Sequence, residues 1–180
     1  YGRKPRSYLN NKVRSSGQFQ VDALITDSYF GGFGISFGHR GSGTWGHVDE
    51  YNAFAGSKSD TPFSNYVVMY AGPQHYPVDL RNHFVLLDTD GSVIKKVSSS
   101  SLWGTNIRLG IVHQMKLSFT PTNIKFYVRA LSGSDTDWHL VLEHTGSFRS
   151  GQVGVYSPIA ASLYGSEPMY NGKLYFRNPK

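Results

Sequence analysis

The stretch QMKLSFTPTNIKFYVRA, residues 114–130, decides the fold class. Apolar and polar residues alternate on both sides of Pro121-Thr122-Asn123, whose residue types favour a tight turn. An antiparallel hairpin of this kind predicts one core-facing side, made of Met115, Leu117 and Phe119 from the first strand and Ile124, Phe126 and Val128 from the second. The sequence therefore predicts paired strands in this region rather than a helix.

The same alternation recurs along the chain between glycine, serine, asparagine, aspartate and proline residues. It predicts further strands at 18–25, 32–38, 66–71, 83–88, 93–97, 139–144, 152–156 and 173–176. About ten to twelve strands at this spacing indicate two packed antiparallel sheets. The predicted fold class is an all-β sandwich of the jelly-roll kind, with few or no helices.

The length and composition of the chain predict one domain. The 180 residues suffice for a single core, which we place at residues 12–180, after a basic N-terminal arm at residues 1–11. There is no cysteine in the sequence. Disulfides, thiolate metal sites and a cysteine nucleophile are therefore excluded.

The charge pattern limits the partners. The formal net charge is +6, but the basic residues are spread along the chain apart from Arg3, Lys4 and Arg6 in the arm. Without a basic stripe interleaved with aromatics, nucleic acid is an improbable partner, whereas an anionic polysaccharide stays open. No apolar run approaches the length of a membrane span. Low charge with many hydroxyl groups and tyrosines predicts a secreted or extracellular protein. The start at Tyr1 without an initiator Met predicts a processed protein or a module that works beside other domains of a longer chain.

Several segments together resemble the concanavalin A-like lectin and glucanase superfamily, which includes laminin-G-like and carbohydrate-binding modules. The resemblance rests on GQFQVD at 17–22, GFGISF at 32–37, HQMKLSF at 113–119, IKFYV at 124–128, GQVGVY at 151–156 and LYF at 174–176. It implies a two-sheet jelly roll. It does not by itself imply one function, because the superfamily holds lectins, glycosidases, lyases and adhesion modules.

Catalytic patterns are weak in this sequence. The Glu-x-Asp-x-x-Glu string of laminarinase-like glycosidases of this fold is absent, and the only glutamates are Glu50, Glu143 and Glu167. A lyase acting on an acidic polysaccharide would use His, Tyr and Arg side chains, which are abundant. The Gln-x-His tripeptide of alginate-lyase-like jelly rolls is not reproduced by His113-Gln114. We predict no catalytic residue.

Aromatic and polar residues near the predicted loops and on one sheet face fit sugar recognition, because rings stack on the C–H face of a sugar while polar groups bond its hydroxyls. The predicted ligand-binding residues are Trp45, His47, Tyr51, Tyr70, His75, Tyr76, Arg81, Trp103, Tyr127, Arg129 and Tyr156. Each of these aromatics can equally serve as core packing.

Two pairs of alternating acids are candidate ligands for a structural calcium ion, which lectins of this superfamily often hold. They are Asp88 with Asp90, and Asp135 with Asp137. Both pairs also match ordinary hairpin turns.

Three functions stay open at this point. The first is a non-catalytic carbohydrate-binding, lectin-like domain that recognises a polysaccharide or glycan. The second is a polysaccharide lyase, and the third is an adhesion or receptor-binding domain of a larger extracellular or viral protein.

Overall fold

The computed structural model describes residues 6–9, 12–25, 32–40, 65–72, 78–100, 107, 110–132, 136–157 and 174–177. These residues form eleven strands in two antiparallel sheets. The six-stranded sheet has the order β1 (Arg6–Leu9), β10 (Gln152–Ser157), β3 (Gly32–His39), β4 (Tyr66–Ala71), β5 (His83–Leu87) and β6 (Val93–Ser98). The five-stranded sheet has the order β11 (Leu174–Arg177), β2 (Gly17–Ile25), β7 (Val112–Phe119), β8 (Asn123–Ala130) and β9 (His139–Thr145).

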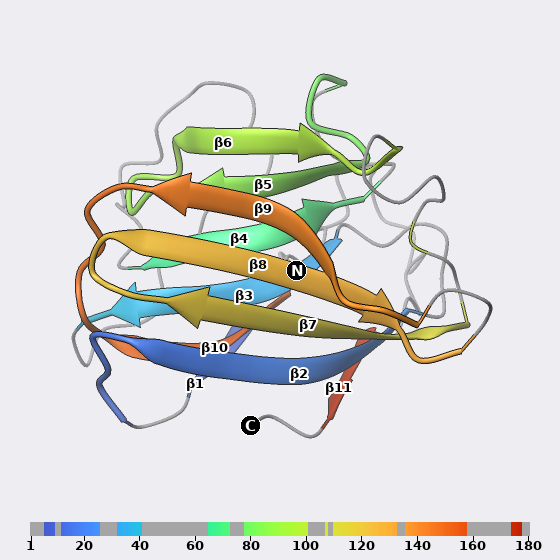
Figure 1. Ribbon diagram of the computed structural model, residues 1–180, viewed down its shortest axis with the longest axis horizontal. Coiled ribbons are helices and arrows are strands. Elements are labelled where there is room, and N and C mark those ends of the chain that lie inside the picture. The colour runs from blue at the N-terminus through green and yellow to red at the C-terminus, as the bar shows by residue number, and fades with distance from the viewer. Residues whose placement is uncertain are drawn as a thin grey trace, which may run out of the picture.

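The predicted two-sheet β-sandwich is confirmed. Figure 1 shows β2, β7, β8 and β9 in the front layer, with the six-stranded sheet behind them. The arm predicted at residues 1–11 contributes β1, whose backbone pairs with β10 at the edge of the six-stranded sheet. Within the described part of the chain, no helix has the length and hydropathy needed to cross a membrane.

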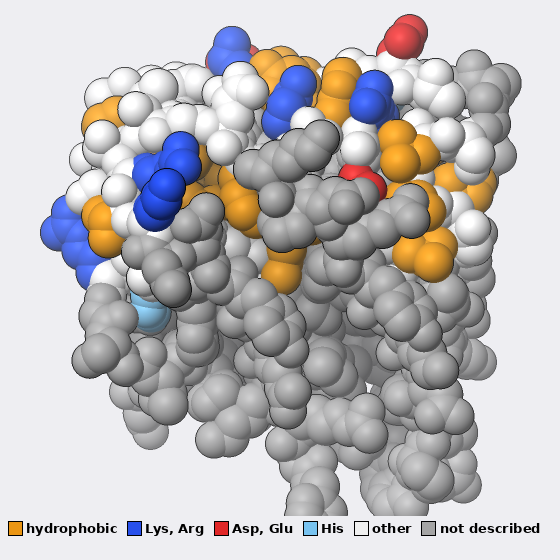
Figure 2. Space-filling view, turned by 90° about the horizontal axis from the view of Figure 1, so that it is seen from below, with side chains coloured by type: hydrophobic (Ala, Val, Ile, Leu, Met, Phe, Trp, Pro, Cys, Tyr) orange, Lys and Arg blue, Asp and Glu red, His pale blue; other side chains and the backbone are white. Residues whose placement is uncertain are grey.

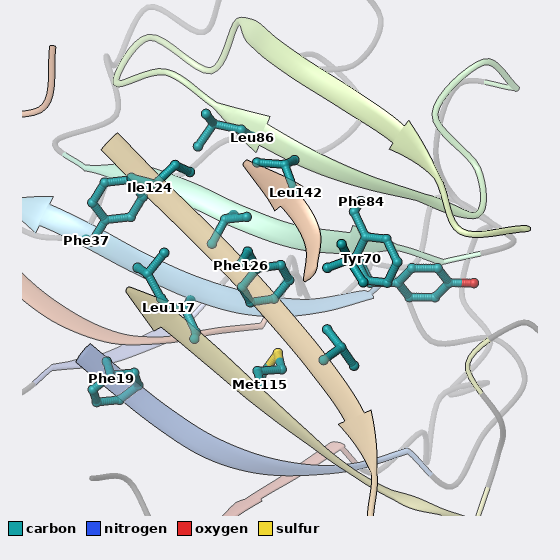
Figure 3. Packing of buried hydrophobic residues seen from close by; sticks show 14 of the residues in the cluster. Phe19, Phe37, Tyr70, Phe84, Leu86, Met115, Leu117, Ile124, Phe126 and Leu142 are labelled. Carbon is teal, nitrogen blue, oxygen red and sulfur yellow. The ribbon is translucent and has the colours of Figure 1, made fainter. Parts of the chain in front are cut away.

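The core lies between the two sheets and follows the predicted alternation. On β7 and β8 every second residue is buried, and the register pairs Met115 with Val128 and Leu117 with Phe126. Figure 3 shows side chains of both sheets meeting in one layer. Each large side chain buried here contributes about 1.5–3 kcal/mol relative to leaving it exposed. This layer holds the five-stranded sheet in place and sends its alternate residues outward.

Strand β4 is buried on both faces. Tyr66, Val68 and Tyr70 join the layer between the sheets, while Val67 and Met69 belong to a second apolar cluster on the other face of the six-stranded sheet. Beside β4, Gly34 of β3 has no room for a side chain, because a Cβ atom there would lie 2.2 Å from the Val68 carbonyl oxygen. Gly34 therefore allows the backbone of β4 to approach β3 closely.

Candidate functional site

Three side chains on the outer face of the five-stranded sheet form a hydrogen-bonded row across β2, β7 and β8. Strand pairing sets Asp22 opposite Gln114, and Gln114 opposite Arg129. The Gln114 Nε2 donates to Asp22 Oδ1 at 2.7 Å, and Arg129 Nε donates to Gln114 Oε1 at 2.8 Å. Both ends of the Gln114 amide are thus used, which fixes its orientation.

The next row along the strands adds two aromatic rings and a lysine. Lys116 of β7 is opposite Tyr127 of β8, and its Nζ lies 4.6 Å from the centroid of the Tyr127 ring. The same Nζ lies 4.3 Å from the centroid of the Trp138 ring, just before β9. Arg129 Cζ lies 4.6 Å from that centroid as well. These are cation–π distances, so the rings and the two cations order one another.

We call these six residues the polar patch: Asp22, Gln114, Lys116, Tyr127, Arg129 and Trp138. Asp22 is only 3% exposed, whereas the other five are half-buried. Further along the same face, Lys125 Nζ lies 3.3 Å from Glu143 Oε1. In the view from below, Lys and Arg side chains alternate with hydrophobic ones along the upper part of the described surface (Figure 2). The patch combines a carboxylate, an amide, two cations and two aromatic rings on a rigid sheet.

The structure brings two of the predicted ligand-binding residues, Tyr127 and Arg129, together in the polar patch. Arg81 is exposed in the turn before β5, and its carbonyl oxygen lies 2.7 Å from His83 Nδ1. The other predictions among the loops, Trp45, His47, Tyr51, His75, Tyr76 and Trp103, lie outside the described residues.

Tyr70 and Tyr156 differ from their predicted place, because the structure buries both. Tyr70 is 1% exposed between the sheets, and its hydroxyl donates to Asn82 Oδ1 at 2.8 Å. Burial raises the pKa of Tyr70 to about 12. Tyr156 is 3% exposed and belongs to the second apolar cluster, beside Met69 and Val85. Alternation alone did not show that the six-stranded sheet is apolar on both faces.

His113, which precedes Gln114 on β7, points the opposite way into the core. It is 1% exposed, with its ring centroid 6.3 Å from that of Phe33. Burial lowers the pKa of His113 to about 4. This histidine is therefore a neutral core residue at physiological pH and does not face the polar patch.

The predicted acid pairs serve as turn residues where the structure describes them. Asp88 Oδ1 accepts from the Thr89 amide at 2.6 Å, and Asp90 Oδ1 accepts from the Ser92 amide at 2.9 Å. Gly91 has a φ of +83° in the same turn. Asp137 is exposed before β9, and Asp135 lies outside the described residues. Among the residues that the structure describes, no three or more His, Asp or Glu side chains gather into a possible metal site.

Sequence reasoning did not select Asp22, Gln114, Lys116 or Trp138 as site residues. Lys116 and Gln114 carry a usable signal, since the hairpin register that pairs Leu117 with Phe126 also sets Lys116 opposite Tyr127 and Gln114 opposite Arg129. Asp22 has no local signal, because its partner Gln114 is 92 positions away. Trp138 follows a turn whose conformation a pattern does not predict.

No protein-family model matches the sequence, and no curated protein matches it. Among solved structures, the chain is similar to a carbohydrate-binding module, CBM66, from Bacillus subtilis, with a TM-score of 0.56, 16% identity and coverage of 98% of this chain and 80% of that one. It is similar to lectin II from Ulex europaeus, with a TM-score of 0.56, 13% identity and coverage of 90% and 77%. It is also similar to the exoplasmic/lumenal domain of VIP36 in a Ca²⁺/Man3GlcNAc-bound form, with a TM-score of 0.58, 11% identity and coverage of 90% and 72%.

At these identities the likeness is one of fold. The order of the strands, the two packed antiparallel sheets and the structural neighbours all agree with the resemblance found in the sequence. The likeness shows that the chain shares the two-sheet β-sandwich fold of these solved structures.

Proposed function

We propose that this domain is a non-catalytic carbohydrate-binding domain that takes a polysaccharide or glycan on the polar patch. The observation that carries the proposal is the row Asp22–Gln114–Arg129 beside the rings of Tyr127 and Trp138. Sugar hydroxyls need donors and acceptors at fixed positions, and amide, carboxylate and guanidinium groups supply both. A sheet face holds such groups more rigidly than a loop does.

The fold neighbours support this proposal. They include a protein named as a carbohydrate-binding module, a plant lectin and a domain in a Man3GlcNAc-bound form. Function does not follow from fold, so the weight rests on the polar patch. We also propose an extracellular or lumenal setting, which is where lectin-like domains meet glycans. Loop residues Trp45, His47, Tyr51, His75, Tyr76, Arg81 and Trp103 remain proposed contacts beyond the patch.

A structural calcium ion is a separate proposal. One structural neighbour, the VIP36 domain, is in a calcium-bound form. Calcium prefers six to eight oxygen ligands. Asp88 and Asp90 supply too few oxygen ligands for such a site by themselves, and one carboxylate oxygen of each already accepts a backbone amide of their own turn. No part of the binding proposal involves a metal.

Affinity electrophoresis through gels that contain single polysaccharides tests the proposal, with neutral and acidic polymers and with or without a chelator. We expect at least one polymer to retard the domain without being shortened. Tyr127→Ala should weaken the retardation, while Val78→Ala, at a position 79% exposed before β5, should not. A shortened polymer would instead indicate a lyase. Failure of every polymer to retard the domain would contradict the proposal and favour a protein receptor.

A further inference from the structure

Two cations of the polar patch lie close to its aromatic rings. Lys116 Nζ and Arg129 Cζ lie 4.3 Å and 4.6 Å from the centroid of the Trp138 ring, and Lys116 Nζ also lies 4.6 Å from that of Tyr127. A cation at such a distance covers one face of the ring, so the C–H face of a neutral sugar cannot stack on that face. The patch therefore presents positive charge held by aromatic rings.

Among the residues that the structure describes, no direct ion pair neutralises the charges of Lys116 and Arg129. Lys125, on the same face, pairs with Glu143, and Lys96 on β6 pairs with Asp79. Neither Lys116 nor Arg129 forms an ion pair with any carboxylate of the described residues. The Gln114 amide links Asp22 to Arg129.

One of the hydrogen-bond donors of Arg129 is used within the patch, and the others lie on its terminal nitrogens. Its Nε is taken by Gln114 Oε1, which fixes the plane of the guanidinium group. A guanidinium carries five N–H donors, so the terminal nitrogens keep donors that suit a planar or tetrahedral anion. Lys116 adds three donors and a second positive charge.

We infer that the polar patch binds an acidic polysaccharide through an anionic group, a carboxylate or a sulfate, which is held by Lys116 and Arg129. The inference rests on the proposed function and deepens it by naming the class of glycan. Trp138 is a positioning residue that orders both cations before the ligand arrives. Ordering a long side chain in advance reduces the entropy lost on binding.

The test uses the whole domain in gels that contain dextran, dextran sulfate or polygalacturonate. Dextran and dextran sulfate differ only in their sulfate groups, and polygalacturonate supplies carboxylates. The variant Lys116→Gln/Arg129→Gln is compared with Lys12→Gln/Arg14→Gln, which also replaces one lysine and one arginine, both exposed and outside the patch. Each double variant lowers the formal net charge from +6 by two, to +4, so general attraction to a polyanion falls equally in both.

We expect the patch variant to lose about tenfold or more in affinity for an acidic polymer, since two charge-assisted contacts are removed. The matched variant should stay within about twofold of the wild type. Comparing the affinities for dextran sulfate and for polygalacturonate shows whether the patch prefers sulfate or carboxylate groups. In addition, Trp138→Leu should weaken binding and Trp138→Phe should restore most of it, because phenylalanine still offers a ring face to the cations.

Equal losses in the two double variants would overturn the inference, because the net charge alone would then explain the binding. So would competition by duplex DNA at the same charge concentration as the polysaccharide. If a neutral polymer retards the domain and the acidic ones do not, the proposed function stands and this inference is wrong. If no polymer of any kind retards the domain, both fail. An unfolding curve should be measured for each variant, to check that a loss of binding is not a loss of folding.

Discussion

The side-chain amide of Gln114 on β7 donates a 2.7 Å hydrogen bond to the carboxylate of Asp22 on β2, where Asp22 is only 3% exposed. A buried carboxylate depends on its hydrogen-bond donors, because water does not replace them. This bond therefore supports both the pairing of β2 with β7 and the position of Arg129.

Replacing Gln114 with leucine should lower the free energy of unfolding by about 1–3 kcal/mol, since a buried carboxylate loses one of its hydrogen-bond donors. Urea denaturation measures the change. Ser118→Ala is the matched control, because Ser118 lies half-buried on the same strand. If the two substitutions cost the same, the Asp22–Gln114 bond is not a major contribution to stability.

The buried His113 should make the domain sensitive to acid. Its pKa is lowered to about 4 by burial, so between pH 6.5 and 4 the unfolded chain binds a proton there that the folded chain does not. This contribution is present above pH 6.5 and is lost as the pH falls. We expect a loss of up to about 3 kcal/mol across that window.

Denaturation curves at several pH values check this, with His113→Phe expected to flatten the profile. An NMR titration offers a second measurement. If the ring signals of His113 shift with a midpoint near pH 6.5 in the folded domain, the prediction is wrong.

Tyr70 should make the domain sensitive to alkali. Its pKa is raised to about 12 by burial, so the folded state keeps the proton between pH 10 and 12 while the unfolded chain releases it. The contribution is complete below pH 10 and falls as the pH rises. Relative to Tyr70→Phe, the wild type should lose about 1–3 kcal/mol over this range. The same loss of stability in Tyr70→Phe as in the wild type would contradict the prediction.

The turn between β5 and β6 should not depend on calcium. Asp90→Ala removes the acceptor of the Ser92 amide and should cost about 0.5–1.5 kcal/mol, while Asp90→Asn keeps an acceptor and should cost little. Thermal unfolding with calcium and with a chelator measures both. A stabilisation by calcium that Asp90→Asn abolishes would show that this turn is a metal site after all.

The alternation of residues 114–130 shows which structural features a sequence pattern can predict. It predicts the hairpin of β7 and β8, and the structure confirms both the strands and the buried set from Met115 to Val128. Tyr127 and Arg129 follow from the same period, because residues between core positions face outward. Local periodicity and turn chemistry therefore suffice where a strand and its partner are neighbours in sequence.

The remainder of the polar patch depends on pairing between distant segments. A one-residue change in the register of β2 would send Asp22 to the core face, and no pattern within β2 names β7 as its partner. Tyr156, by contrast, was predicted as a ligand-binding residue and is buried. It lies outward by alternation, yet the face it occupies is apolar and buried, which only the neighbouring residues of β4 and β5 determine.

Strands near one end of the described chain pair with strands near the other end. β1 pairs with β10, and β11 pairs with β2, while β2 has its other partner in β7 (Figure 1). During synthesis, β2 leaves the ribosome long before β7 and β11 exist, so it has no partner and exposes half of a future core. Neither sheet can close until almost the whole domain has been made, which predicts a slowly folding chain that is prone to aggregate while it is being translated.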